Sequence, residues 1–342
     1  MEHDDGVAVA GEKTYKGGFF ANLLRKMKDS RGLEVIGSIE STTILNKDSS
    51  NITMDDWQLI TDCVVKNYDS FDAFIVTHGT DTMGYTTSAV SFALGNLGKP
   101  VIFTGSQVSY GQLGSDAVMN LENCLRLLVI EPDIAGVFLV FGTQIVSGTR
   151  VKKKTEFDYD SFKGVRRFTD IGTFGNTVDI KIPALTIHTS FLGTRSKSAK
   201  GLDVRNNFER DIVCLSMFPG LSSQIIIDLA KNGTKGFVLR AYGDGDTNIT
   251  PEGGPGTLND AFQYLMDNKI PLVITDQTPF GVASMTRYAP GVLARERFNA
   301  IPGRDLSVEA AVVKLSWLLA NGHSYDEIRE LMQQSLRGEI SG

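Results

Sequence analysis

The sequence predicts a two-domain α/β fold, with a larger N-terminal domain built on a mostly parallel sheet and a smaller C-terminal α/β domain. Short apolar runs alternate with helical patterns along the chain, which is typical of βαβ units. The length of 342 residues exceeds what one typical hydrophobic core serves. Residues 196–211 are poor in large apolar side chains, so we expect an interdomain linker there, between domains at 1–195 and 212–342.

The first domain shows three strand signals, and the first two are each followed by a helix signal. Apolar runs at 73–76, 101–104 and 136–141 predict buried strands, and the patterns at 86–94 and 116–129 predict helices. In open parallel sheets, ligands bind in the turns at the carboxyl ends of the strands. We therefore expect functional residues directly after these runs.

The second domain repeats the alternation. The runs at 212–217, 236–240 and 272–275 predict strands, with helices at 221–232 and 257–267 between them.

Two further helices close the chain, and neither is expected to carry chemistry. Ser307 is a candidate cap for the first, and Ser324 and Glu327 have capping-box spacing at the start of the second. The first helix places these apolar residues on one face: Val308, Ala311, Val312, Leu315 and Leu319.

Composition excludes several classes of function. The formal charge of -6 argues against nucleic acid and against an anionic membrane surface as partners. No apolar run approaches the roughly 20 residues of a membrane-spanning helix. The start, Met-Glu-His-Asp-Asp, has no apolar core and is not a signal peptide.

Cysteine and histidine usage points to a cytosolic protein without a metal site. Cys63, Cys124 and Cys214 are far apart and odd in number, so we expect reduced, buried thiols and a cytoplasmic location. The four histidines show no ligand spacing with one another or with cysteine. We expect no metal and no cofactor.

The segment His78-Gly79-Thr80-Asp81-Thr82 is the strongest functional signal, because it follows a buried strand and precedes a helix. Its hydroxyls and carboxylate suit binding of a small polar substrate and activation of a nucleophile. The structural alternative is a helix N-terminus, where Thr and Asp are favoured. We interpret His78 as a hydrogen-bonded structural residue and not as a general base.

Two other segments have plain structural interpretations beside functional ones. Asp48-Ser49-Ser50 is typical of a surface turn that caps a helix, but its hydroxyls and amides suit a substrate carboxylate. Lys152-Lys153-Lys154 is typical of a solvated face, but one lysine turned inward beside a carboxylate could exchange a proton with a threonine. The run itself does not show which lysine this is.

The chain resembles the L-asparaginase family, in particular its cytosolic type I branch, and the match runs through nearly the whole sequence. The motifs that carry the resemblance are Asp48–Ser50, 78–82, Lys99–Gln107, Ser115–Leu121 and a weaker one at Leu336–Glu339. The resemblance implies an asparaginase-like fold and hydrolysis of L-asparagine, without metal or cofactor. It also implies a homo-oligomer, a dimer or a tetramer.

The resemblance also implies roles for individual residues. Thr80 and Asp81 match family residues that act with one lysine, and counting along the Arg-x-x-Lys pattern from Arg150 selects Lys153. Asp48, Ser49 and Ser50 match the loop that binds the amino-acid substrate, together with Thr80 and Asp81. An amidotransferase component acting on charged tRNA shares this triad, but the acidic balance disfavours it.

One departure from the family pattern matters for catalysis. Family members begin with a strand and a Thr-Gly-Gly-Thr-Ile-Gly turn whose second threonine is a nucleophile, and Thr-Gly-Gly-Thr is absent from the 342 residues. We therefore expect a family member without its first strand and nucleophile turn. The alternative to an active amidohydrolase is a non-catalytic chain that binds an amino acid or joins full-length subunits.

Overall fold

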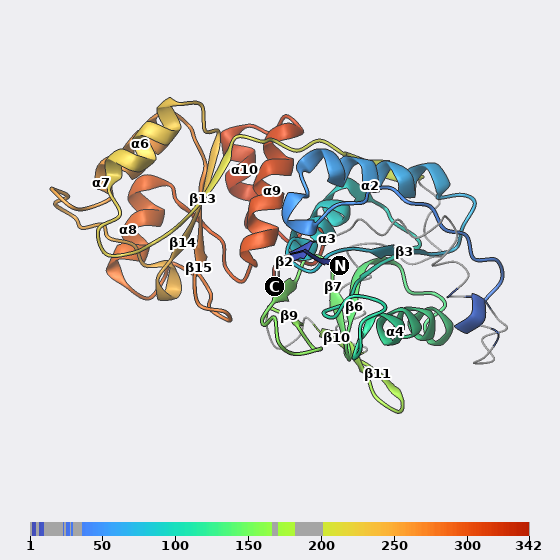
Figure 1. Cartoon of the computed structure of the whole chain (residues 1–342). Helices are drawn as coiled ribbons and strands as arrows, with labels where there is room; N and C mark the ends of the chain where they lie inside the picture. Colours follow the sequence, from blue (N-terminus) through green and yellow to red (C-terminus); the bar gives the residue numbers. More distant parts are fainter. Residues whose placement is uncertain are drawn as a thin grey trace. The chain divides into compact units, whose positions relative to one another are not determined.

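The computed structural model describes residues 2–4, 7–9, 23, 25–27, 29, 36–165, 170–181 and 201–341. The chain divides into two compact units (Figure 1). The first unit runs to Gly164 and continues from Phe168 to Val204, and the second consists of Val165–Arg167 and Arg205–Gly342. The expected boundaries at 195, 211 and 212 stay a prediction, and part of the expected linker, 196–200, lies outside the described residues.

The first unit contains a mixed six-stranded sheet with the order β11-β10-β7-β6-β5-β3. The strands β3, β5 and β6 are parallel, while β7, β10 and β11 continue the sheet in antiparallel pairs. The α/β class is therefore confirmed, with antiparallel strands on one side of the sheet. The bounds are β3 Phe74–Thr77, β5 Pro100–Thr104, β6 Gly136–Phe141, β7 Gln144–Ser147, β10 Asp170–Phe174 and β11 Val178–Ile180.

Helices cover both faces of this sheet. Side chains alternate along each strand, so each strand places apolar side chains on both faces, and both faces are covered. Val101 and Phe103 pack with residues of α2 (Met54–Asn67) and α3 (Met83–Ala93). Ile102 packs on the other face, with residues of α4 (Ala117–Ile130). The alternation explains why the central strands are fully buried and why an unbroken apolar run identified them.

Small elements complete the first unit. Three two-stranded pairs form between β1 and β2, β4 and β12, and β8 and β9. A 3-10 turn, η1 (Ser49–Asn51), precedes α2. The strand bounds are β1 Glu2–Asp4, β2 Val7–Val9, β4 Leu94–Gly95, β12 Asp203–Val204, β8 Val151–Lys153 and β9 Phe162–Gly164.

The second unit is a parallel sheet, β13-β14-β15-β16, with its own apolar core. The strands are β13 Ile212–Ser216, β14 Gly236–Ala241, β15 Leu272–Asp276 and β16 Ile301–Pro302, with a 3-10 turn, η3, at Gly243–Gly245. The helices are α6 Ser223–Lys231, α7 Asn259–Asp267, α8 Ala289–Phe298, α9 Val308–Ala320 and α10 Tyr325–Leu331.

The caps predicted for the closing helices are present. The Ser307 hydroxyl accepts a hydrogen bond from Ala310 N at 3.0 Å, and Ser324 with Glu327 forms a capping box. These bonds from Ser324 lower the pKa of the Glu327 carboxyl. Helix α9 is buried on more than the predicted face, and the Trp317 indole donates to Arg205 O at 2.9 Å.

The last residues of the chain are held by an ion pair buried inside the second unit. Lys314 Nζ lies 2.6 Å from Glu339 Oε1, and both side chains are 0% exposed. Glu339 also accepts hydrogen bonds from Leu336 N and Arg337 N. Burial alone would raise the pKa of Glu339, but the Lys314 ammonium and these N–H donors lower it. Burial lowers the pKa of Lys314.

All three cysteines carry free thiols, and they differ in burial. Cys124 is buried, which raises the pKa of its thiol to about 12. Cys63 is only half-buried and Cys214 is exposed, so the expectation that all three are buried was wrong for these two. Cys214 lies on β13, where the half-buried neighbours Val213 and Leu215 point to the core and alternation sends position 214 outward. The described helices include none long and apolar enough to cross a membrane.

Candidate active site

The turn at residues 78–82 connects the end of β3 to α3. Strand β3 pairs in parallel with β5, so the turn lies at the carboxyl edge of the parallel strands. His78 N donates to Thr104 O at 2.8 Å, which extends the pairing one residue past β3. Thr80, Asp81 and Thr82 therefore follow the strand end where the sequence predicted them.

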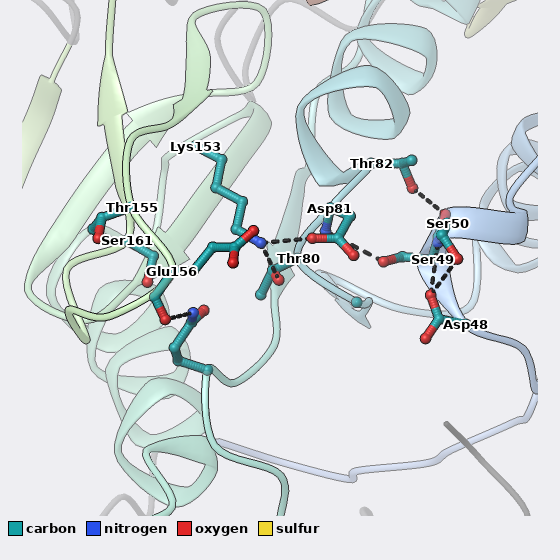
Figure 2. A network of polar contacts seen from close by, with 12 residues as sticks. Asp48, Ser49, Ser50, Thr80, Asp81, Thr82, Lys153, Thr155, Glu156 and Ser161 are labelled. Atoms are coloured by element: carbon teal, nitrogen blue, oxygen red, sulfur yellow. Dashed lines mark hydrogen bonds and ion pairs between the residues drawn. The ribbon is translucent and has the colours of Figure 1, made fainter. Parts of the chain in front are cut away.

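One lysine of the basic run reaches this turn. Lys153 Nζ donates to Thr80 Oγ1 at 3.0 Å and to Asp81 Oδ1 at 2.6 Å (Figure 2). The lysine side chain is 19% exposed and the aspartate side chain 54%, so the cluster is open to a ligand. A lysine in contact with a hydroxyl and a carboxylate can take the hydroxyl proton when it is a neutral amine, and can return it as an ammonium.

Strand β8 positions Lys153. Its partner across the β8–β9 pair is Phe162, whose ring is buried against Phe141 with 4.9 Å between centroids. Before β8, the carbonyl of Gly148 accepts a hydrogen bond from the Thr87 hydroxyl on α3 at 2.7 Å. Helix α3, which follows the turn at residues 78–82, therefore also holds the segment that leads into β8 and Lys153.

The serine loop, residues 48–50, touches the same turn through one residue. Asp81 N donates to Ser49 Oγ at 3.2 Å, and the Thr82 hydroxyl donates to Ser49 O at 2.7 Å. Asp48 and Ser50 bond to each other, since Asp48 Oδ1 accepts from Ser50 N at 2.8 Å and from its hydroxyl at 2.7 Å. These bonds lower the pKa of Asp48.

The structural interpretation of the serine loop is partly correct. Asp48 caps η1, while the cap of α2 is Thr53, in a capping box with Asp56. The carboxylate of Asp48 and the hydroxyl of Ser50 are therefore held by local bonds, and Ser49 alone of the three bonds to the turn.

Gly79 lets the serine loop approach. A Cβ atom at residue 79 would lie 2.6 Å from Ser49 Oγ and 2.7 Å from Ser49 Cβ. Such contacts are far inside ordinary van der Waals separation, so a side chain here would push the two loops apart. The close approach brings the Ser49 hydroxyl to the backbone of Asp81.

Both ring nitrogens of His78 bond within the protein and stabilise the turn. Its Nδ1 lies 2.6 Å from Gly79 O and its Nε2 3.0 Å from Thr86 Oγ1. Because a carbonyl only accepts, Nδ1 carries the proton, and Nε2 accepts from the Thr86 hydroxyl. Burial lowers the pKa of His78, which favours this neutral form. This agrees with the structural role predicted for His78.

A second network braces the turn after β5, and reasoning from single residues missed it. The Asp116 carboxylate accepts from Gln107 N and Val108 N at 2.9 Å. Asn120 Nδ2 donates to Asp116 Oδ2 and to Gly105 O, both at 2.9 Å. Gly105, Gln107, Asp116 and Asn120 fall in two of the segments that carry the family resemblance. An aspartate at a helix start, four residues before an asparagine, was the available signal.

Family models match most of the chain. The model described as "Asparaginase, N-terminal" matches residues 6–185, and the model described as "Glutaminase/Asparaginase C-terminal domain" matches residues 211–332. A two-domain α/β fold with these matches defines the asparaginase class of amidohydrolases. The chain belongs to the asparaginase family.

Individual relatives agree with this assignment. The chain is 35% identical over 303 residues to L-asparaginase 1 of Escherichia coli, covering 86% of this chain and 82% of that protein. The crystal structure of L-asparaginase I from Vibrio cholerae has a TM-score of 0.81 and 30% identity, covering 97% of this chain and 95% of that one. The chain is also 32% identical to a glutamyl-tRNA(Gln) amidotransferase component of Aeropyrum pernix, covering 90% of this chain and 71% of that protein.

Proposed function

We propose that this chain carries the site of an L-asparagine amidohydrolase, which converts L-asparagine and water to L-aspartate and ammonia. The observation that supports this most directly is the contact of Lys153 Nζ with both Thr80 and Asp81. These three residues come from two segments more than 70 residues apart, and the family resemblance selected the same three.

In the proposed mechanism, Lys153 moves the proton. A threonine hydroxyl attacks the side-chain amide to form an acyl-enzyme and release ammonia, and water then releases L-aspartate. In its neutral amine form, Lys153 takes the hydroxyl proton and becomes an ammonium, which then gives that proton to the leaving nitrogen. Asp81 orients the lysine and receives the amino group of the substrate. Ser49 and Ser50, with Asp48 holding their loop, receive the substrate carboxylate, and backbone N–H groups of the turns stabilise the oxyanion.

The nucleophile is the open part of this proposal. The family nucleophile lies in a Thr-Gly-Gly-Thr turn that the 342 residues lack, and Thr80 Oγ1 is the hydroxyl in contact with Lys153. Within the described residues, β3 is an edge strand whose residues are half-buried or exposed. An edge of this kind has unpaired backbone groups that accept a further strand. We propose that full activity needs such a strand with its threonine turn.

The competing proposal is a non-catalytic chain that binds an amino acid or joins complete subunits. The absent turn motivates it, because loss of a covalent nucleophile costs several orders of magnitude in rate. An amidotransferase component is a further candidate, since relatives with that name cover 90% of this chain. The charge of -6 speaks against a direct tRNA contact by this chain. Assembly as a dimer or tetramer and a cytoplasmic location stay predictions.

The test is ammonia release from L-asparagine by the 342-residue chain and by the chain with a family strand and turn added upstream. We expect turnover in the extended chain, with glutamine as the weaker substrate. Full-rate hydrolysis by the shorter chain would eliminate the non-catalytic alternative. An extended chain that is silent on both amides would refute the amidohydrolase proposal.

A further inference from the structure

Glu156 lies in the loop between β8 and β9, residues 154–161, which follows the strand that carries Lys153. Lys154 N donates to Ser161 O at 2.8 Å and closes the loop. Inside it, Phe157 N donates to Thr155 Oγ1 at 3.1 Å, which turns the chain at residue 156. Figure 2 shows the Glu156 side chain directed toward Lys153, on the side away from the serine loop.

The backbone of Glu156 is held from a different segment. The Gln107 side-chain amide donates to Glu156 O, and the Tyr159 hydroxyl donates to Gly114 O at 2.8 Å. Gln107 is in turn held through its backbone by Asp116. One bond thus holds the backbone of the exposed Glu156, and a second, from Tyr159, ties the same loop to the segment after β5.

The charge of Glu156 is not matched by the nearby cation. Lys153 carries one positive charge, and Asp81 takes it at 2.6 Å. Glu156 forms no ion pair within the described part of the chain. Figure 2 therefore shows two carboxylates, those of Asp81 and Glu156, directed toward the ammonium of Lys153.

The contacts of Asp81 indicate which end of a bound substrate lies near the Glu156 carboxylate. Asp81 contacts the serine loop through its backbone N and Lys153 through its carboxylate. On the proposed function, the α-carboxylate of the substrate lies toward the serine loop and the side-chain amide lies toward Thr80 and Lys153. Glu156 thus faces the end where a neutral amide becomes a carboxylate.

We infer that Glu156 is a specificity-determining residue that favours the neutral amide of the substrate over the carboxylate of the product. This inference rests on the proposed function of the same site. The amide carries no charge, whereas the product carboxylate is repelled by a second carboxylate nearby. Discrimination here works by penalising the wrong ligand, with no added contact to the right one. Weaker product binding would also speed release of L-aspartate.

The experiment is calorimetric binding of two ligands to the 342-residue chain. L-aspartate carries the second carboxylate, and L-homoserine has a neutral hydroxyl in its place and no bond to hydrolyse. We expect Glu156→Gln to tighten L-aspartate binding by about two- to fivefold at low salt. Binding of L-homoserine should stay unchanged. The matched control is Asp158→Asn, which removes the same charge from the same loop.

Three outcomes would overturn the inference. An unchanged ratio of the two affinities in Glu156→Gln refutes it and leaves the proposed function standing. An equal shift in Asp158→Asn assigns the effect to net charge and also refutes it. If the unmodified chain and the chain with a family strand and turn added upstream both bind neither ligand, the proposed function is refuted and the inference with it.

Discussion

Two lysine–carboxylate pairs of the same length occupy different surroundings. In the Lys153–Asp81 pair, Nζ and Oδ1 are 2.6 Å apart and the side chains are 19% and 54% exposed. In the Lys314–Glu339 pair the distance is also 2.6 Å, and both side chains are 0% exposed. Distance alone therefore does not distinguish a reactive pair from a structural one.

The two pairs differ in the other hydrogen bonds that their charged groups make. Lys314 also donates to the carbonyls of Met332 and Gln334, and Glu339 accepts two backbone N–H bonds, so the protein satisfies both groups. Lys153 shares its ammonium between Asp81 and the Thr80 hydroxyl beside solvent. An exposed pair contributes little to stability, whereas removal of one member of a buried pair leaves a charge without compensation. The comparison predicts that one pair controls turnover and the other controls folding.

The largest expected effect is on catalysis. Lys153→Met in the chain with a family strand and turn added upstream should lower kcat by about 10⁴-fold or more, because the proton carrier is lost. The free energy of unfolding should change by less than about 1 kcal/mol, since the Asp81 partner is 54% exposed and solvent screens the pair. Ammonia release and urea unfolding measure the two quantities. Lys152→Met is the matched control, and an active Lys153→Met variant would contradict the assignment.

The next effect is on stability. Lys314→Met should lower the free energy of unfolding of the second unit by about 3–5 kcal/mol, because Glu339 is left buried without its cation. The double variant Lys314→Met with Glu339→Leu should recover most of this loss, since no buried charge remains. Chemical unfolding followed by circular dichroism measures both. If the double variant is no more stable than the single one, the pair does not account for the loss.

A smaller effect tests how the site is assembled. Gly79→Ala should destabilise the first unit by about 1–3 kcal/mol, because the new Cβ overlaps Ser49. Binding of L-aspartate should weaken as the serine loop moves away from Asp81. Gly201→Ala is the control, since a Cβ there meets no atom within 4 Å. Equal stability of the two variants, measured by thermal unfolding, would show that the loops tolerate the added atom.

The smallest effect is the pH dependence of the buried pair. The pKa of Glu339 is lowered in the folded state, so its contribution to stability is present above the ordinary pKa of 4.5. That contribution is lost as pH falls through the folded pKa, because the unfolded chain binds the proton more readily. The double variant without the pair should therefore lose less stability below about pH 4.5. If the unmodified chain and the double variant lose stability equally as the pH falls below about 4.5, the expected pH dependence is contradicted.

Local patterns predicted the strands and caps well. The buried strands β5 and β6 were found because both of their faces are covered and the apolar run is unbroken. Ser307 and Ser324 were found because a cap depends on residues three positions apart. The antiparallel half of the first sheet was not predicted, since strand pairing is set by contacts between distant segments.

The site was predicted as residue types and not as a geometry. The strand-to-helix turn identified Thr80 and Asp81, and family spacing selected Lys153. Three adjacent lysines are equivalent in charge, and only the pairing of β8 with β9 determines which one turns inward. The bond from Asp81 to Ser49 joins residues 32 positions apart, and no local pattern signals it. The sequence predicted the helix around Lys314 but not its buried ion pair. The partner, Glu339, lies near the end of the chain, beyond the reach of any local pattern.

The tryptophans give each unit its own optical signal. The chain has two of them, Trp57 on α2 in the first unit and Trp317 on α9 in the second, and both are buried. Replacing either with phenylalanine leaves a single indole whose emission reports the melting of one unit alone. Intrinsic fluorescence can thereby distinguish a substitution that destabilises the first unit, near the turn at residues 78–82, from one that destabilises the second unit, near the Lys314–Glu339 pair. No added label is needed.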